Sequence, residues 1–441
     1  MMNFKNLESA CQAAGITEVE VYRTLAEGSA VSTVNKEIDQ NMIYSRDEVY
    51  VRGVYDGHIS TVYVENDSDE EINEIVHRIK SSSKIIESAD PYFIYGGSES
   101  YPEIIEKEND YDSYSQADMI EICRKMESFI YEKCEFVLQS QAAVEIEKET
   151  VTIENSNGLS VRRSTQDALV VCVGVVRRDG ESKQGYYMYH LNKLSDIDYD
   201  KLYKKAVERP LSSIGAKSIP SKAYPVVFEN SQFASLISCF YSMFSADAVI
   251  KKLSLLEGKV GEKIFGDNIT ITDNPQLEES PSRVSFDDEG VAAYPKTIVE
   301  NGKLVSYLQK LKTAKILDPV STGNGFKDSN GAISVSPSNL CIAPSDISFD
   351  DMIKGVEDGV FITQMMGQHA GVNTVSGAFN LQASGYRIRD GKIAEPVTLI
   401  VVSGNIIDLL NNVECLANDF EVSRKVACPS VLIKSLSISG Q

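Results

Sequence analysis

Residues 355–412 constrain the fold of this chain more than any other stretch, because they combine frequent glycines with short apolar runs. The runs 360–362 and 399–402 are strand-like, and small polar residues fill the gaps between them. Glycine inside strand-like sequence marks bulges, tight turns or the close approach of another backbone. This stretch therefore predicts a bent antiparallel sheet around a cleft. Glycines recur inside it at Gly359, Gly367, Gly371, Gly377, Gly385, Gly391 and Gly404.

The same stretch supplies the candidate binding residues. Glycine leaves room for another backbone, and the short Asn and Ser side chains offer polar groups without charge. An extended peptide could then be accepted as an added strand, held mainly by main-chain hydrogen bonds. His369 could donate or accept a hydrogen bond near neutral pH. Two simpler interpretations stay open: the glycines serve only sheet curvature, and His369 is a loop histidine bonded to backbone. The candidate peptide-cleft residues are Gly367, His369, Asn373, Ser376, Gly377, Phe379, Ser384 and Gly385.

The N-terminal half predicts two similar units, residues 1–90 and 115–210, each with the order helix, strands, helix. They share no repeat at the level of residues. The Pro- and Ser-containing segment 210–222 predicts a domain boundary. We therefore expect an N-terminal α+β domain, 1–215, and a C-terminal domain, 223–441.

Local motifs place some turns and helix ends in the N-terminal half. Asp56-Gly57 and Asn157-Gly158 lie between strand-like runs, and both dipeptides favour the tight turns of β-hairpins. Ser68 and Glu71 have the spacing of a capping box, which predicts the start of a helix.

The C-terminal half predicts a mainly antiparallel β domain with one long helix. The run YPVVFE (224–229) is typical of a strand, and apolar residues then recur at helical spacing over 231–255. Later segments are strand and turn, apart from a second helix around 405–416. The TGNG sequence at 322–325 lacks the Lys and second Gly of a phosphate loop and is interpreted as a mobile loop. The whole chain is therefore assigned to the α+β class.

Composition excludes several classes of protein. The chain has 43 Lys and Arg against 64 Asp and Glu, a net charge of −21, so we expect no nucleic acid partner. No apolar run approaches the ~18 residues of a membrane span, and the first residues lack the pattern of a signal peptide. The eight cysteines form no CxxC pair, which predicts reduced thiols rather than a disulfide framework or zinc ribbon. We therefore expect a cytoplasmic protein without membrane contact.

Three ordered blocks carry a resemblance to a known family. SGAFNLQASGYRIRDGKI (376–393) is followed by SGN at 403–405, and FDDEGV (286–291) and NGKLVSYL (301–308) precede it. Together they resemble the TldD/PmbA (TldE) family, whose members are also named modulators of DNA gyrase and are metalloprotease subunits. The resemblance covers 223–441 closely and the first half more weakly. It implies a PmbA/TldD-like fold.

The catalytic TldD branch of this family carries HExxxH on the helix after the first strand of the C-terminal domain. Two such histidines can hold Zn²⁺, and the Glu can activate its bound water. Counting back from the matching block KKLSLLEGKVGE (251–262) finds neither His nor Glu at these positions. Isoleucine has no donor atom, and serine is a poor zinc ligand. We therefore predict no catalytic residue and no metal in this chain, with zinc held by a partner. The equivalent positions are Ile237, Ser238, Cys239, Phe240, Tyr241 and Ser242.

The resemblance implies a PmbA/TldE-type subunit, without the zinc motif, of a cytosolic metalloprotease that degrades or matures small unfolded peptides. Its partner would be a TldD-like HExxxH subunit in a heterodimer. Two alternatives stay open. The chain is a stand-alone peptide-binding or assembly protein, for example a homodimer, or it is an independent hydrolase with an unrecognised site. A serine hydrolase needs a positioned base, and the chain has no GxSxG elbow.

Overall fold

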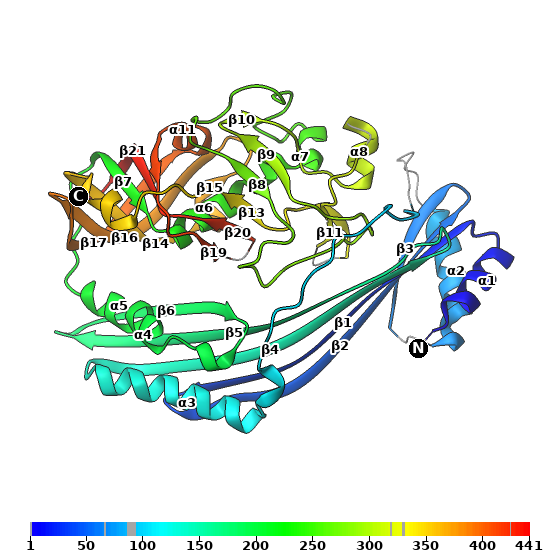
Figure 1. Cartoon of the computed structure of the whole chain (residues 1–441), viewed down its shortest axis with the longest axis horizontal. Coiled ribbons are helices and arrows are strands. Elements are labelled where there is room, and N and C mark those ends of the chain that lie inside the picture. Colours follow the sequence, from blue (N-terminus) through cyan, green and yellow to red (C-terminus); the bar gives the residue numbers. More distant parts are fainter. Residues whose placement is uncertain (1, 66–67, 86–93, 318–319, 329–330, 424) are drawn as a thin grey trace.

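The chain is built around separate sheets in its two halves (Figure 1). The computed structural model describes residues 2–65, 68–85, 94–317, 320–328, 331–423 and 425–441. Both halves contain helices and runs of strands, and most strand pairs are antiparallel, so the α+β class is confirmed.

The N-terminal half holds one continuous antiparallel sheet of six strands, in the order β3-β2-β1-β4-β5-β6. Asp56-Gly57 joins β2 to β3 and Asn157-Gly158 joins β4 to β5, so both predicted hairpins are confirmed. β1 and β4 pair from Glu20 opposite Asn155 to Val34 opposite Gln141, so both helix–strands–helix units contribute to a single sheet. The strands are β1 (Glu18–Val34), β2 (Glu37–Tyr55), β3 (His58–Val64), β4 (Val137–Asn155), β5 (Ser160–Arg178) and β6 (Glu181–Leu191).

Helices pack on this sheet at its two ends. α1 (Phe4–Ala13) and α2 (Ile72–Ser83) bury apolar residues against β1, β2 and β3. α3 (Gln116–Lys133) begins at a capping box formed by Ser115 and Asp118, and its apolar stripe packs on β4 and β5. The last helix of the predicted unit 115–210 forms as α4 (Tyr199–Tyr203), a π turn (Lys204–Glu208) and α5 (Arg209–Ser212). Helical structure therefore extends into the predicted boundary segment.

The largest sheet of the C-terminal half closes on itself. β14 pairs with β7 on one side and with β16 on the other, which joins β14, β7, β21, β17 and β16 into a barrel. β15 continues the pairing of β16 beyond the end of β14, and β18 pairs with β21. The strands are β7 (Lys222–Phe228), β14 (Asp358–Met366), β15 (Val372–Asn373), β16 (Ala378–Arg389), β17 (Lys392–Asn405), β18 (Val413–Leu416) and β21 (Val431–Ser439).

A second sheet lies beside the barrel, in the order β10-β9-β8-β13-β20-β19 (Figure 1). Its strands are β8 (Ile271–Asp273), β9 (Lys296–Glu300), β10 (Lys303–Leu304), β13 (Leu340–Ile342), β19 (Glu421–Ser423) and β20 (Val426–Cys428). β11 (Gly325–Lys327) and β12 (Ile333–Val335) form a small hairpin. The helices of this half are α6 (Asn230–Phe240), α7 (Ala246–Ile250), α8 (Leu311–Leu317), α9 (Phe349–Lys354), α10 (Gln368–Gly371) and α11 (Ile406–Asn411).

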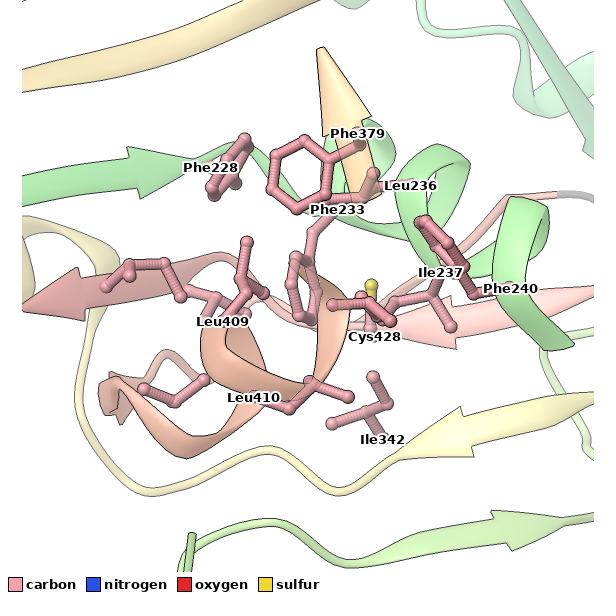
Figure 2. Packing of buried hydrophobic residues seen from close by; sticks show 14 of the residues in the cluster. Phe228, Phe233, Leu236, Ile237, Phe240, Ile342, Phe379, Leu409, Leu410 and Cys428 are labelled. Carbon is pink, nitrogen blue, oxygen red and sulfur yellow. The ribbon is translucent and has the colours of Figure 1, made fainter. Parts of the chain in front are cut away.

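The main core of the C-terminal half joins the barrel to the second sheet. Phe233 and Phe240 of α6 pack with Phe228 of β7 and Leu409 of α11 (Figure 2). All four side chains are at most 1% exposed. Burying one such large side chain contributes on the order of 2 kcal/mol, so α6 is fixed in place chiefly by this packing.

The prediction of one long helix over 231–255 is wrong. α6 ends at Phe240, a 3-10 turn follows at Tyr241–Phe244, and α7 starts at Ala246. Leu308 N donates to Phe244 O at 2.8 Å, and Ala246 N donates to Leu308 O at 3.0 Å. A distant segment therefore takes the hydrogen bonds that would continue the helix, and tertiary context overrides the apolar spacing. The helix predicted at 405–416 is likewise shorter, because β18 begins at Val413.

The predicted capping box at Ser68 is also wrong, although helix α2 forms. The Ser68 side chain makes no capping hydrogen bond, and α2 begins at Ile72 after a 3-10 turn. The neighbouring Asp69 instead accepts from Asn3 N and Asn6 Nδ2, both at 2.7 Å. This acid therefore helps to fix the start of α1.

The interpretation of residues 322–325 as a mobile loop is wrong. Asn324 is fully buried. Its Nδ2 donates to Asp273 Oδ2 at 2.7 Å and to Ser336 O at 3.0 Å. The segment is therefore a hydrogen-bonded part of the interior.

Two sequence expectations concern the chain as a whole. Cys239 and Cys415 are half-buried and the other six cysteines are buried, and none of the eight, all of which are described, lies in a disulfide. Among the residues that the structure describes, no helix is long and apolar enough to cross a membrane.

Candidate functional site

A hollow of about 620 Å³ opens where β14 ends and β15 pairs with β16. Residues of β14, α10, β15 and β16 form its walls, so it lies within the glycine-rich stretch. Every lining side chain is uncharged. The lining residues are Met366, Gly367, Ala370, Gly371, Val372, Asn373, Ala378, Asn380 and Gln382.

Glycine shapes this hollow at two positions. Gly367 has φ +87°, a left-handed conformation that favours glycine, and it begins the short turn of α10. At Gly371, an added Cβ would lie 2.2 Å from Asn380 O. Only a residue without a side chain lets the end of α10 approach β16 so closely. These two glycines therefore serve a close backbone approach as well as a turn.

Strand alternation decides which side chains of β16 reach the hollow. Ala378, Asn380 and Gln382 line it, whereas Phe379 and Leu381 are fully buried. Successive side chains of a strand point to opposite faces, so this division follows from the period of two. Phe379, a predicted cleft residue, lies in the main core (Figure 2).

The remaining predicted cleft residues lie in several places. His369 is exposed and does not line the hollow, and Ser384 Oγ donates to Gln364 Oε1 at 3.2 Å. Gly385 lies within the barrel wall, where an added Cβ would be 1.9 Å from Phe361 O. Of the eight predicted residues, the structure brings only Gly367 and Asn373 together at the hollow.

The loop after β15 is a defined turn. Asn373 Oδ1 accepts from Val375 N at 3.1 Å and Ser376 N at 2.9 Å, and Gly377 N donates to Asn373 O at 2.9 Å. Asn405 Nδ2 donates to Ser376 O at 2.8 Å, which ties the turn to the end of β17. Ser376 and Gly377 therefore fix the shape of the loop that flanks the hollow.

Sequence reasoning missed Gln382 and the apolar lining residues. Ala378, Asn380 and Gln382 alternate along β16, so a period-two analysis of this stretch would have found them. The side chains present can hold peptide groups by amide hydrogen bonds. They include no acid or base for proton transfer.

The positions equivalent to the zinc motif lie on α6 and just after it. Ile237 and Phe240 are at most 1% exposed and point into the main core (Figure 2). Ser238 Oγ donates to Ser235 O at 2.8 Å, and Ser242 lies in the 3-10 turn beyond the helix. Across the described residues, no group of three His, Cys, Asp or Glu side chains is placed to hold a metal ion. The residues at the expected zinc site therefore do not fit zinc.

The FDDEGV block forms a buried junction between the halves of the chain. Arg163 of β5 pairs with Asp288 at 2.6 Å and also donates to Phe286 O. Asp288 accepts from Lys327 N at 2.8 Å. Burial raises the pKa of Asp287 well above its ordinary value, and the charge of nearby Glu289 raises it further. The block therefore anchors the N-terminal sheet to the C-terminal half.

Comparisons with known proteins agree with this architecture. Residues 109–214 match the PmbA/TldA metallopeptidase central domain, and residues 221–440 match its C-terminal domain. A metalloprotease PmbA homolog from Buchnera aphidicola is 29% identical over 69% of this chain and 69% of its own length. Across curated relatives named PmbA, the matched part spans 53% to 69% of the relative.

Solved structures extend the likeness over the whole chain. One from Thermotoga maritima, named as a candidate modulator of a DNA gyrase, is 29% identical, with a TM-score of 0.90 and 99% of both chains covered. TldE from Thermococcus kodakarensis shares the fold at 22% identity, with a TM-score of 0.88 over 99% of this chain and all of TldE. The predicted family resemblance and fold are thereby confirmed. The chain belongs to the PmbA/TldD family, whose relatives include proteins named metalloproteases.

Proposed function

We propose that this chain is the PmbA/TldE-type subunit of a cytoplasmic peptidase for small unfolded peptides. A TldD-like partner carrying HExxxH would supply the zinc and the catalytic Glu. One observation carries the proposal: the chain combines an uncharged hollow in the family's signature stretch with Ile237 and Ser242 at the positions of the two zinc-binding histidines.

The hollow suits the backbone of an extended peptide. β15 is the terminal strand of its sheet, so an added strand can pair with it. The side-chain amides of Asn373, Asn380 and Gln382 can donate to and accept from peptide groups. Because no lining side chain is charged, this mode would accept many sequences.

The absence of donor atoms at Ile237 supports the proposal that a second chain performs the chemistry. This chain would bind and orient the peptide, while the partner would hold the metal ion that activates water. The two alternative functions predict different behaviour. A stand-alone binding protein needs no partner, and an independent hydrolase cleaves peptides alone.

Co-expression with a TldD-like HExxxH chain from the same organism tests the proposal. We expect the two chains to co-purify and to cleave an unstructured peptide that neither cleaves alone. A Glu→Gln change in the partner's motif should abolish cleavage. Cleavage by this chain alone would support the independent hydrolase, and peptide binding without pairing would support the stand-alone binding protein.

A matched pair of variants tests the hollow. Asn380→Ala should leave pairing intact and slow cleavage several-fold, since one lost hydrogen bond costs about 1 kcal/mol. Asn41→Ala changes an exposed strand asparagine of β2 and should have no effect. Equal cleavage by the two variants would remove the hollow from the peptide path.

A further inference from the structure

The N-terminal sheet has an open edge along the first part of β5. β6 pairs with β5 only from Ala168 to Arg178. The preceding residues, 161–167, pair with β4 on one side, and no described strand pairs with them on the other. An open strand edge presents unpaired backbone groups that another chain can use.

The hairpin geometry shows which groups face this edge. Asn155 N donates to Leu159 O at 3.0 Å, which makes these two residues a hydrogen-bonded pair. Hydrogen-bonded and non-hydrogen-bonded pairs alternate along an antiparallel ladder. The backbone N–H and C=O groups of Arg162, Ser164 and Gln166 therefore point away from β4. Within the described part of the chain, these outward groups have no hydrogen-bond partner.

A groove runs along this edge. Its main part is a hollow of about 540 Å³ lined by 161–164 on one side and by 101–104 and Glu106 on the other. A narrower hollow of about 60 Å³ continues beside Ser164 and Gln166. We call the two together the edge groove. The outer wall belongs to the connector that descends to α3 (Figure 1).

The outer wall is fixed by hydrogen bonds to the C-terminal half. Tyr101 Oη donates to Gly290 O at 2.9 Å, and Arg283 Nη1 donates to Ile105 O at 2.8 Å. The edge groove therefore has two anchored walls. The edge groove is separate from the hollow at β15, because the lining residues of the two hollows do not overlap.

The edge groove is cationic in a strongly acidic protein. Lys107, Lys148, Arg162, Arg163 and Arg283 line it, against only Glu103 and Glu106. Arg163 is paired with Asp288, whereas Lys148 and Arg162 are exposed. The chain as a whole carries a net charge of −21, so the local charge of the edge groove has the opposite sign to that of the whole chain.

We infer that the edge groove binds an acidic peptide segment in extended conformation, added as a strand along residues 161–167 of β5. The outward N–H and C=O groups of Arg162, Ser164 and Gln166 would pair with the peptide backbone. Lys148 and Arg162 would face acidic side chains of the peptide. The net charge of −21 disfavours a long polyanion such as nucleic acid, whereas a short peptide fits within the local field. This inference does not rest on the proposed function.

Fluorescence anisotropy with the full chain tests the inference. The probe is a short labelled peptide of alternating Thr and Glu, in which Thr favours strand structure and Glu supplies negative charge. We expect saturable binding that weakens as salt is added. A probe with Gln in place of Glu tests the charge. A probe with alternate amides N-methylated keeps the charge and removes backbone donors.

Protein variants locate the site. Because exposed ion pairs contribute modestly, Lys148→Gln with Arg162→Gln should weaken binding by about three- to tenfold. Lys392→Gln removes an exposed lysine from a strand of the barrel and should leave binding unchanged. Circular dichroism checks that the variants remain folded.

Several results would overturn the inference. These are no saturable binding of the Glu probe, equal binding by the double variant and Lys392→Gln, or equal binding of the N-methylated probe. Tighter binding of a single-stranded oligonucleotide than of the peptide would show a general anion site instead. These assays measure peptide binding and not cleavage by a complex of this chain with a TldD-like partner. A negative result would therefore leave the proposed peptidase role untouched.

Discussion

Glu229 provides the sharpest test of how the two halves are held together. It follows β7, and its carboxylate lies between two cations of the helical segment that ends the N-terminal half. Arg209 donates to it through two nitrogens, at 2.8 and 2.7 Å, and Lys205 Nζ donates to the same group. The Glu229 side chain is only 8% exposed, and those of Lys205 and Arg209 are 20% and 28% exposed.

The pKa of Glu229 sets the size of the expected effect. Burial alone would raise this pKa, but the hydrogen bonds and charges of Arg209 and Lys205 lower it from 4.5 to about 2. Because a tenfold change in proton affinity corresponds to ~1.4 kcal/mol, the lowering corresponds to about 3 kcal/mol of stability at neutral pH. Breaking a buried pair by removing one partner costs about 3–5 kcal/mol, which agrees in size.

The sign of the pH dependence follows from the lowered pKa. The folded state holds the Glu229 proton more weakly than the unfolded state does. The stabilisation is therefore fully present above the ordinary pKa and is lost as the pH falls toward the folded value. Glu229→Gln should reduce the free energy of unfolding by about 3 kcal/mol at neutral pH. At pH ~3 the difference from wild type should shrink to about 1.5 kcal/mol.

Urea denaturation followed by far-ultraviolet circular dichroism measures both values, since the chain has no tryptophan to report by fluorescence. The control is Glu395→Gln, which breaks an exposed pair with Arg389 at 2.7 Å and should cost less than ~1 kcal/mol. A Glu229→Gln variant as stable as the control would refute the reasoning. So would a gap that stays constant between the two pH values.

Three further predictions follow from the site and the fold. Elemental analysis of the purified chain should find no stoichiometric zinc, because Ile237 has no donor atom and Ser242 is a poor zinc ligand; about one zinc per chain would contradict this. Gly385→Val should lower the free energy of unfolding by several kcal/mol, since its Cβ would lie 1.9 Å from Phe361 O, whereas Ser384→Ala should change it little. Limited proteolysis should cut first within 213–221, and initial cuts inside β4 or β5 would count against the predicted domain boundary.

The hairpins were predictable because their signal is local. Asp56-Gly57 and Asn157-Gly158 lie in the turns between the strands that they join. Asp56, Gly57 and Gly158 adopt positive φ. The pairing of β1 with β4 was not predictable. Glu20 and Asn155 lie far apart in sequence, and no local pattern specifies their register.

Helix boundaries failed where other segments intervened. Apolar spacing continues through 231–255, but α6 ends at Phe240, and the backbone of Leu308 bonds to Phe244 and Ala246, where a continuous helix would have to run. At Ser68 the motif was present, yet Asp69 bonds to the start of α1. In both cases a partner from elsewhere in the chain decided the outcome.

The candidate site was predictable in location more than in detail. Glycine density identified the stretch that contains the hollow. It could not separate glycines that serve the barrel wall, such as Gly385, from those at the hollow, such as Gly371. Composition alone also gave no sign that the TGNG segment is buried, because its order depends on Asp273 in a distant strand.

Because the cysteines lie in different cores, thiol alkylation can distinguish the opening of one core from the opening of another. Cys11 lies in the core under α1 and α2, Cys123 and Cys172 lie in the core under α3, and Cys428 lies in the main core of the C-terminal half. Burial raises the pKa of all four thiols, so each is protected from alkylation while its own core is closed. Cys239 and Cys415 are half-buried and should react earlier. The order in which the others become alkylated would therefore report which core opens first, without any engineered label.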